Sequence, residues 1–157
     1  MKKLLLFIAL ALFTGSIYAQ DDNAEAKLKN EGNEALRAKN YKLALEKLEE
    51  YLKLIDFKGD DATVYNVAFA ANRVKDYAKA EKDFDMSIQN SYKPQAAYAG
   101  KANAQKAQNK TNEMLQTLQA GIKALPGKSA DLEKMYAVHY LKAGQDFQKK
   151  DNIAKAA

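Results

Sequence analysis

The sequence contains no cysteine, one histidine, two prolines and seven glycines among its 157 residues. Without cysteine no disulfide can form and no lipid can be attached through a cysteine at a mature N-terminus, so packing alone must stabilise the fold. The side chains that most often build metal sites and nucleophilic triads are also nearly absent. We therefore find no basis for catalysis, a metal site or a cofactor in these residues, and we predict that the chain is not an enzyme.

Residues that favour helices are abundant, in contrast to the scarce prolines and glycines. Ala, Lys and Leu are the most frequent residues, and they lose little rotamer freedom in a helix. The chain is 47% hydrophobic and 29% charged, as in ordinary globular domains and unlike disordered chains. From Ala24 onward, apolar or small residues recur at helical spacing, and no convincing strand pattern occurs. Composition and periodicity together predict an all-α domain.

The N-terminus has the layout of a signal peptide. Two lysines precede an unbroken apolar run over residues 4–13, residues 14–16 break the run, and Ala19, with Ile17 two positions before it, offers a cleavage site. We predict a signal peptide over 1–19, a short linker over 20–23, and a mature chain that is periplasmic or secreted. An uncleaved membrane anchor is the alternative, but the run is much shorter than the roughly 20 residues that span a bilayer.

The charge balance is only mildly basic. The full chain has a formal charge of +5, and removing the two lysines of the predicted signal peptide leaves 23 basic and 20 acidic residues, a charge of +3. Binding to a phosphate backbone needs a clustered basic face, which this dispersed excess does not supply. We expect no nucleic-acid partner and no stable membrane span.

Short polar breaks divide residues 24–157 into segments of about 14 residues, each sufficient for one helix. Because the connections are short, consecutive helices are expected to run antiparallel, as hairpins. The predicted breaks lie at 39–40, 57–61, 75–76, 91–94, 109–110, 126–128 and 150–151.

The hairpins repeat along the chain. Residues 40–44 (NYKLA) are echoed by 76–80 (DYAKA), thirty-six residues later, and by 152–156 (NIAKA). A fixed period indicates an open stack of similar units rather than a closed bundle.

These units resemble the tetratricopeptide repeat, a 34-residue helix-turn-helix motif with small and bulky residues at fixed places on both helices. The matching residues are Leu28, Gly32, Tyr41, Ala44 and Leu48 in repeat one (25–60), and Val64, Ala68, Tyr77, Ala80, Phe84 and Ser87 in repeat two (61–94). Repeat three (95–128) supplies Tyr98, Ala102, Leu118, Gly121 and Pro126, and an extended helix with a truncated fourth repeat (129–157) supplies Tyr140, Gly144, Phe147 and Ile153.

The resemblance implies an open right-handed superhelix, an α-solenoid of antiparallel hairpins, in an exported bacterial protein. Two helices of a hairpin approach closely where their residues are small, so we predict contacts of Gly32 with Ala44 and of Ala68 with Ala80. Repeat three is the weakest match, because Met114 stands where a small residue is usual.

The resemblance also implies a concave groove, lined by the first helix of each hairpin, in which family members hold partners. Here the groove would combine cations, amides and two aromatic rings, which suits an extended peptide or protein segment with acidic groups. The candidate residues are Lys29, Asn33, Arg37, Tyr65, Asn66, Phe69, Asn72, Arg73, Asn103 and Lys106. The alternative is that these are ordinary solvated helix faces.

Some family members clamp the terminal carboxylate of a chaperone tail. Lys29, Asn33 and Asn66 match that set, but Ala96 and Gly100 stand where its charged half should be, and those chaperones are cytosolic. The resemblance therefore does not imply a complete clamp.

Two further features have plain structural interpretations. Asp60 and Asp61 could suggest acid–base chemistry, but at a helix start a carboxylate caps free amides, so we predict capping. His139 has no metal-ligand spacing to a second ligand, and we predict a surface or half-buried imidazole beside Tyr140.

We therefore expect an extracytoplasmic, non-catalytic scaffold that binds a protein or peptide. Two alternatives remain open: a structural or self-associating module, and a docking arm of a larger protein whose functional domain lies beyond Ala157. The last unit stops without the polar cap that ends such stacks, so either the native protein continues or the last helix frays.

Overall fold

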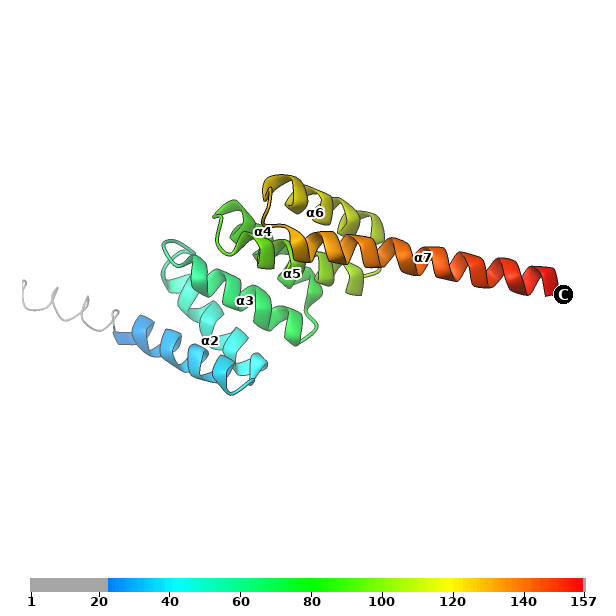
Figure 1. The fold of residues 1–157 in the computed structure, drawn as a ribbon. Coiled ribbons are helices and arrows are strands. Elements are labelled where there is room, and N and C mark those ends of the chain that lie inside the picture. The colour runs from blue at the N-terminus through cyan, green and yellow to red at the C-terminus, as the bar shows by residue number, and fades with distance from the viewer. Residues whose placement is uncertain (1–22, 157) are drawn as a thin grey trace, which may run out of the picture.

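The computed structural model describes residues 23–156, which are helical throughout apart from short turns (Figure 1). The first helix covers residues 23–37. It is followed by α2 (Tyr41–Leu54), α3 (Asp61–Arg73), α4 (Tyr77–Gln89), α5 (Pro94–Ala107), α6 (Thr111–Ala124) and α7 (Ala130–Ala156). The predicted signal peptide and its cleavage site lie outside the described residues. Within the described part, no helix combines the length and apolar character needed to cross a membrane.

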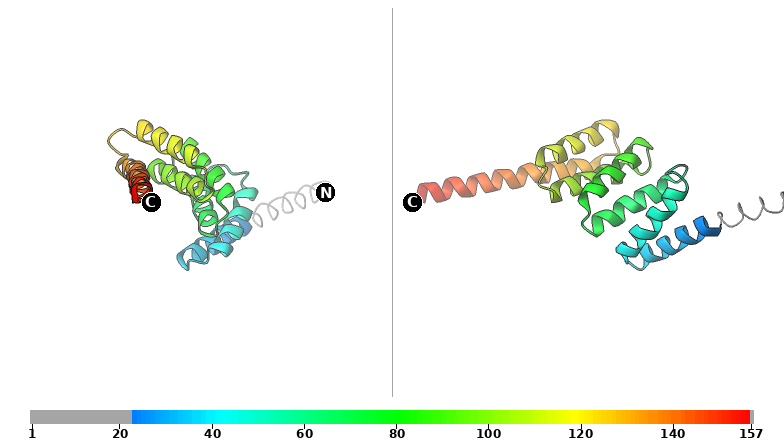
Figure 2. Two further views of the ribbon diagram at one scale, coloured as in Figure 1. Left: turned by 90° about the vertical axis from the view of Figure 1, so that its right-hand side faces the viewer. Right: turned by 180° about the vertical axis from the view of Figure 1, so that it is seen from behind.

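The helices form consecutive antiparallel hairpins that stack side by side (Figure 2). Each of the helices α2 to α7 packs on the next, and α3 and α7 both contact α5 as well. This neighbour-to-neighbour packing is typical of a solenoid, in which each unit buries its apolar face on the adjoining one. The predicted all-α, open right-handed superhelix is confirmed.

Polar residues at the predicted breaks start the helices. The Asn40 side chain accepts a hydrogen bond from the Leu43 amide at 3.3 Å, and Asp76 caps α4 in the same way. Such caps satisfy amide groups that have no partner inside the helix. Just before these caps, Lys39 and Lys75 adopt positive φ values of 58° and 68°, the left-handed conformation that ends a helix.

Small residues bring the helices of each hairpin together, with one difference from the prediction. Ala68 and Ala80 are fully buried in one core cluster, as expected. Gly32, however, faces Leu48 rather than Ala44: a Cβ on Gly32 would lie 2.5 Å from Leu48 Cδ2. The predicted partner is wrong by one turn, because a long helical side chain leans back over the preceding turn.

A second glycine sets the approach of α4 and α5. A Cβ on Gly100 would lie between 2.4 and 2.7 Å from three ring carbons of Phe84, a ring that is itself fully buried. No real Cβ contact is that short, so only glycine fits here. The absence of a side chain at Gly100 is therefore a packing requirement of the junction between repeats two and three.

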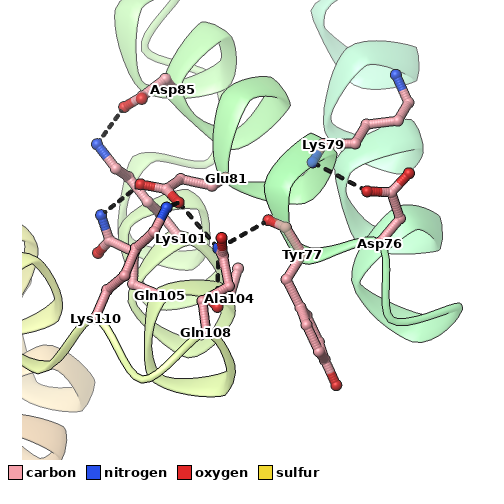
Figure 3. A network of polar contacts seen from close by, with 10 residues as sticks. All are labelled: Asp76, Tyr77, Lys79, Glu81, Asp85, Lys101, Ala104, Gln105, Gln108 and Lys110. Carbon is pink, nitrogen blue, oxygen red and sulfur yellow. Dashed lines mark hydrogen bonds and ion pairs between the residues drawn. The ribbon is translucent and has the colours of Figure 1, made fainter.

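A polar network crosses the same junction (Figure 3). The Glu81 carboxylate on α4 accepts hydrogen bonds from Gln105 Nε2 at 2.9 Å, Gln108 Nε2 at 3.0 Å and Lys110 Nζ at 2.8 Å. One carboxylate thus ties α4 to the end of α5 and to the start of α6. Both oxygens of the Glu81 carboxylate are thus paired, as partly buried charges require, whereas the buried Gln105 Oε1 accepts no hydrogen bond from a described residue.

The last helix corrects the prediction for the fourth unit. The predicted break at 150–151 is absent, because α7 continues as one helix to Ala156. Tyr140 is 53% exposed, and a Cβ on Gly144 would meet no atom within 4 Å among the described residues. Among the described residues nothing packs against Gly144 and Tyr140 stays largely exposed, so these two residues do not mark the packing of α7 on α6.

Leu132 takes the packing position instead. It is fully buried, and a Cβ on Gly121 of α6 would lie 2.6 Å from its Cδ1 atom. Leu132 follows Tyr98 by thirty-four residues, just as Tyr98 follows Val64. The packing register of α7 therefore begins eight residues earlier than the prediction placed it.

Candidate functional site

Five of the ten predicted groove residues contribute to three surfaces. The first lies between helix 23–37 and the start of α3, where Lys29 Nζ lies 2.7 Å from Asp60 Oδ2. Asp60 caps α3 by accepting hydrogen bonds from the Thr63 amide at 3.0 Å and the Thr63 hydroxyl at 2.8 Å, and the Tyr51 hydroxyl also donates to it at 3.0 Å. Capping by Asp60 is confirmed, and Lys29 is engaged by a carboxylate of its own chain.

The electrostatics of this pair favour its charged form. Burial alone would raise the pKa of the Asp60 carboxyl, but hydrogen bonds from Lys29, Thr63 and Tyr51 outweigh burial and lower that pKa below its ordinary value. The hydrogen bond to Asp60 raises the pKa of the Lys29 amine. Both groups are therefore ionised at neutral pH, and Lys29 is not a free cation waiting for a ligand.

The second surface is an aromatic–arginine cluster made of Tyr41, Phe69 and Arg73. The Arg73 guanidinium carbon lies 5.0 Å from the centre of the Tyr41 ring and 5.7 Å from that of Phe69. The two rings meet edge to face with centroids 5.8 Å apart. Phe69 is 37% exposed, and no carboxylate of a described residue lies within 4.0 Å of Arg73.

Tyr65, at the other end of α3, is packed by its neighbours. Its ring centre lies 5.7 Å from that of Phe84 and 6.0 Å from that of Tyr92, and Lys93 Nζ lies 5.1 Å above it. Burial raises the pKa of the Tyr65 hydroxyl. This ring therefore contributes mainly to the core between α3 and α4, and only its half-exposed edge is left for a partner.

The third surface is a groove of about 470 Å³ between α5, α6 and α7. Asn103 and Lys106 of α5, two of the predicted groove residues, are exposed and form one side of it. The other lining residues are Met114, Leu118, Lys134, Met135, Val138, His139, Lys142, Ala143 and Asp146. Most of these come from α7, which sequence reasoning did not assign to any binding surface.

The remaining candidates are placed as follows. In helix 23–37, Asn33 is half-buried and Arg37 is exposed, while Asn66 and Asn72 are half-buried on α3. His139 is half-buried with its ring centre 5.6 Å from that of Tyr140, as predicted. Within the part of the chain that the structure describes, no three His, Cys, Asp or Glu side chains gather closely enough to hold a metal ion.

Sequence reasoning overlooked two contributors to these surfaces. The repeat pattern assigns Tyr41 only a packing role, whereas in the structure the Arg73 guanidinium lies over its ring. The groove-lining side of α7 carries its own signal, since two apolar residues, Met135 and Val138, and then Lys142 follow one another at three- and four-residue steps and so share one side of a helix.

Comparison with solved structures places the fold among tetratricopeptide repeat proteins. A TPR repeats protein from Bacteroides fragilis is 46% identical to this chain, with a TM-score of 0.73, over 84% of this chain and 58% of its own length. The Arabidopsis OM64 TPR domain is 21% identical, with a TM-score of 0.60, over 76% of this chain and 98% of that domain.

A third similar structure contains a ligand. The second TPR domain of human RPAP3, in complex with the HSP70 peptide SGPTIEEVD, is 20% identical, with a TM-score of 0.60, over 74% of this chain and 98% of that domain. At about one-fifth identity this likeness, like that to OM64, describes the fold alone. No protein-family model and no curated protein matches the chain.

Proposed function

This chain belongs to the tetratricopeptide repeat family, and from that premise we propose that it is a non-catalytic scaffold that binds an extended protein segment. The proposal extends to location: the N-terminal residues 1–19 have the composition of an export signal, so the scaffold acts outside the cytoplasm. The chain spans only 58% of the length of the Bacteroides fragilis protein. Our proposal therefore concerns the repeat array itself, and the activity of a longer protein containing it would be a separate proposal.

The observation that carries the proposal is the aromatic–arginine cluster. Its guanidinium is held in place by two rings and has no carboxylate among the described residues, while Phe69 remains partly exposed beside it. A planar guanidinium binds carboxylates with two parallel hydrogen bonds, and an adjacent aromatic ring supplies apolar contact area. This arrangement fits a peptide that places an acidic side chain next to an apolar one.

The position of the acidic group differs from the one that the sequence suggested. Lys29 already pairs with Asp60, so the carboxylate of a partner is expected at Arg73. The RPAP3 domain binds a peptide with consecutive glutamates, which supports the view that this fold can hold acidic extended segments. A chaperone-type clamp is a poor model for this chain, because Gly100 cannot be replaced without displacing Phe84.

The test uses the chain without residues 1–19 and a library of fluorescein-labelled nine-residue peptides that differ in acidic content. We expect Arg73→Gln to weaken binding of the acidic peptides about tenfold, since a hydrogen bond to a charged group contributes about 1.5–3 kcal/mol. Phe69→Ala should weaken binding to a similar degree, because it removes the apolar contact area beside the guanidinium. Lys75→Gln, an exposed cation two residues further on, is the control and should leave affinity unchanged. Equal binding by the wild type and Arg73→Gln, or a preference for uncharged peptides, contradicts the proposal.

Self-association is the second candidate, favoured by the exposure of large apolar residues on α7. Val138, Tyr140 and Leu141 are 53%, 53% and 66% exposed. Sedimentation velocity over a range of concentrations separates the two candidates. A monomer at every concentration supports peptide binding, whereas a dimer that Leu141→Asp disrupts supports self-association.

A further inference from the structure

We propose that the groove between α5, α6 and α7 is a second binding surface, separate from the aromatic–arginine cluster, and that it takes a short acidic segment carrying a large aliphatic side chain. We call it the α7 groove and define it by Met114, Leu118, Met135 and Val138 inside and Lys106, Lys134 and Lys142 around the rim. This inference is independent of the proposed function, because no residue of α3 lines the α7 groove.

The groove lies where α7 passes beside the end of α5 and the start of α6. The helices α2 to α6 end after 13 or 14 residues, whereas α7 has 27 and continues past the turn that joins α5 to α6 (Figures 1 and 2). Residues from Lys134 to Asp146 therefore pass beside the end of α5 and the first turns of α6. All the α7 residues that line the groove, except Asp146, lie within the first 14 residues of the helix, so the groove is formed by the part of α7 that matches α5 and α6 in length.

The interior of the groove is apolar and adaptable. Met114 and Leu118 are 4% and 0% exposed and form its floor, while Met135 is half-buried and Val138 is 53% exposed on the α7 side. Methionine side chains are flexible and polarizable, and they are over-represented on surfaces that bind varied aliphatic groups. A volume of about 470 Å³ holds a few side chains of a peptide, within the range of ordinary ligand pockets.

The rim carries a clear excess of positive charge. Three lysine amines surround the groove, against one carboxylate, that of Asp146. No carboxylate of a described residue lies within 4.0 Å of the amine of Lys106, Lys134 or Lys142. The imidazole of His139 also lines the groove. Such a rim attracts carboxylates and repels cationic segments.

Charge complementarity decides between possible occupants. A second copy of this chain would present the outer turns of its own α7, whose sequence from Leu141 to Lys150 has three lysines and one aspartate. Lysines would then face lysines, which disfavours that arrangement. An acidic segment with a leucine or methionine satisfies both the interior and the rim, because its aliphatic side chain can pack on Met135 and Val138 while its carboxylates remain near the amines.

The experiment measures fluorescence anisotropy of a labelled peptide, Glu-Asp-Leu-Leu-Asp-Glu, with the chain lacking residues 1–19. Two control peptides replace the leucines with serines, or the acids with their amides, and each is expected to bind at least tenfold more weakly. Val138→Asp should weaken binding of the first peptide at least tenfold. The matched control is Leu141→Asp, a more exposed residue that lies outside the groove lining, and it should change affinity by less than twofold.

A second pair of variants tests the rim. Lys142→Glu should weaken binding several-fold, and more at low salt than at high salt, while Lys149→Glu on the same helix should not. Circular dichroism of all four variants checks that the helices are intact, and since each substituted side chain is largely exposed, folding is expected to be preserved.

Several outcomes overturn the inference. Failure of the leucine-containing peptide to bind does so, as does equal weakening by Val138→Asp and Leu141→Asp. Binding that Arg73→Gln abolishes and Val138→Asp leaves intact would place the peptide on α3, supporting the proposed function alone. Loss through Val138→Asp with no effect of Arg73→Gln would support the α7 groove alone. A dimer that Val138→Asp dissociates would show that a second copy fills the groove.

Discussion

Lys29 on the first helix reaches the Asp60 carboxylate that starts α3, with Nζ and Oδ2 2.7 Å apart. A single side chain, Asp60, thus caps one helix, accepts a hydrogen bond from Tyr51 on α2 and pairs with a cation on a third helix. Repeat one and repeat two are joined at this point. The contact also removes Lys29 from the set of cations available to a partner.

Replacement of Asp60 tests this junction. Asp60→Ala removes the cap and leaves Lys29 and Tyr51 without their acceptor, so the free energy of unfolding should fall by about 1–2 kcal/mol. Asp60→Asn retains a capping oxygen and should cost clearly less. Urea denaturation followed by circular dichroism measures both, and Glu50→Ala, an exposed acid on α2, should stay within about 0.5 kcal/mol of the wild type. Equal stability of Asp60→Ala and the wild type would contradict the capping role.

The same residue predicts a dependence on pH. The pKa of Asp60 is lower in the folded chain than in the unfolded chain, so its stabilisation is complete above the ordinary aspartate pKa of about 4 and is lost as pH falls through the lowered folded value. We expect stability to decline below about pH 4, and Asp60→Asn to show a shallower decline there than the wild type. Denaturation midpoints measured from pH 7 to pH 3 give this comparison, and parallel curves for the two proteins would refute it.

Two glycines provide a matched pair. Gly100→Ala places a Cβ inside the Phe84 ring contact, and overpacking of this kind should cost about 1–3 kcal/mol. Gly144→Ala meets open space among the described residues within a helix, so it should stabilise by roughly 0.5–1 kcal/mol through helix propensity. Thermal melts of both variants measure the difference. The two substitutions should change the stability of the fold in opposite directions, and a destabilising Gly144→Ala would indicate that another segment packs there.

Ala80 tests the close contact inside repeat two. Ala80 is fully buried in one cluster with Ala68, so Ala80→Leu should lower stability by about 1–3 kcal/mol. Ala78→Leu introduces the same side chain two residues earlier, where it is exposed, and should change stability by less than about 0.5 kcal/mol. Urea denaturation of the pair gives the answer, and an unchanged midpoint for Ala80→Leu would show that the helix register is wrong.

Local signals made most of the fold predictable from the sequence. The caps at Asn40 and Asp76 and the buried alanines of repeat two depend on neighbours within one hairpin, which the 34-residue pattern already relates. The prediction for the fourth unit failed because Tyr140 and Gly144 show the four-residue step of a packed helix, whereas the α7 residue that packs on Gly121 is Leu132. The spacing from Tyr98 to Leu132 contained the correct register.

The candidate site was less predictable, since its contacts join residues far apart in the chain. The pairing of Lys29 with Asp60 and the stacking of Arg73 on Tyr41 span 31 and 32 residues, and they depend on how one hairpin rests on the next. Residue type alone marked Lys29 and Arg73 as equivalent cations. Only the superhelical packing shows that one is neutralised and the other is not.

The position of α5 gives the array a property that its individual hairpins lack. This helix packs on α3, α4, α6 and α7, whereas neighbour-only contacts would allow each end of a solenoid to melt on its own. Heat or denaturant must therefore disrupt α5 before the two ends of the array become independent. Substitutions that weaken the packing of α5 on Phe84 should split the single cooperative unfolding transition into two. Because Asn103 and Lys106 lie on α5, a ligand held there would tighten both ends of the array at once.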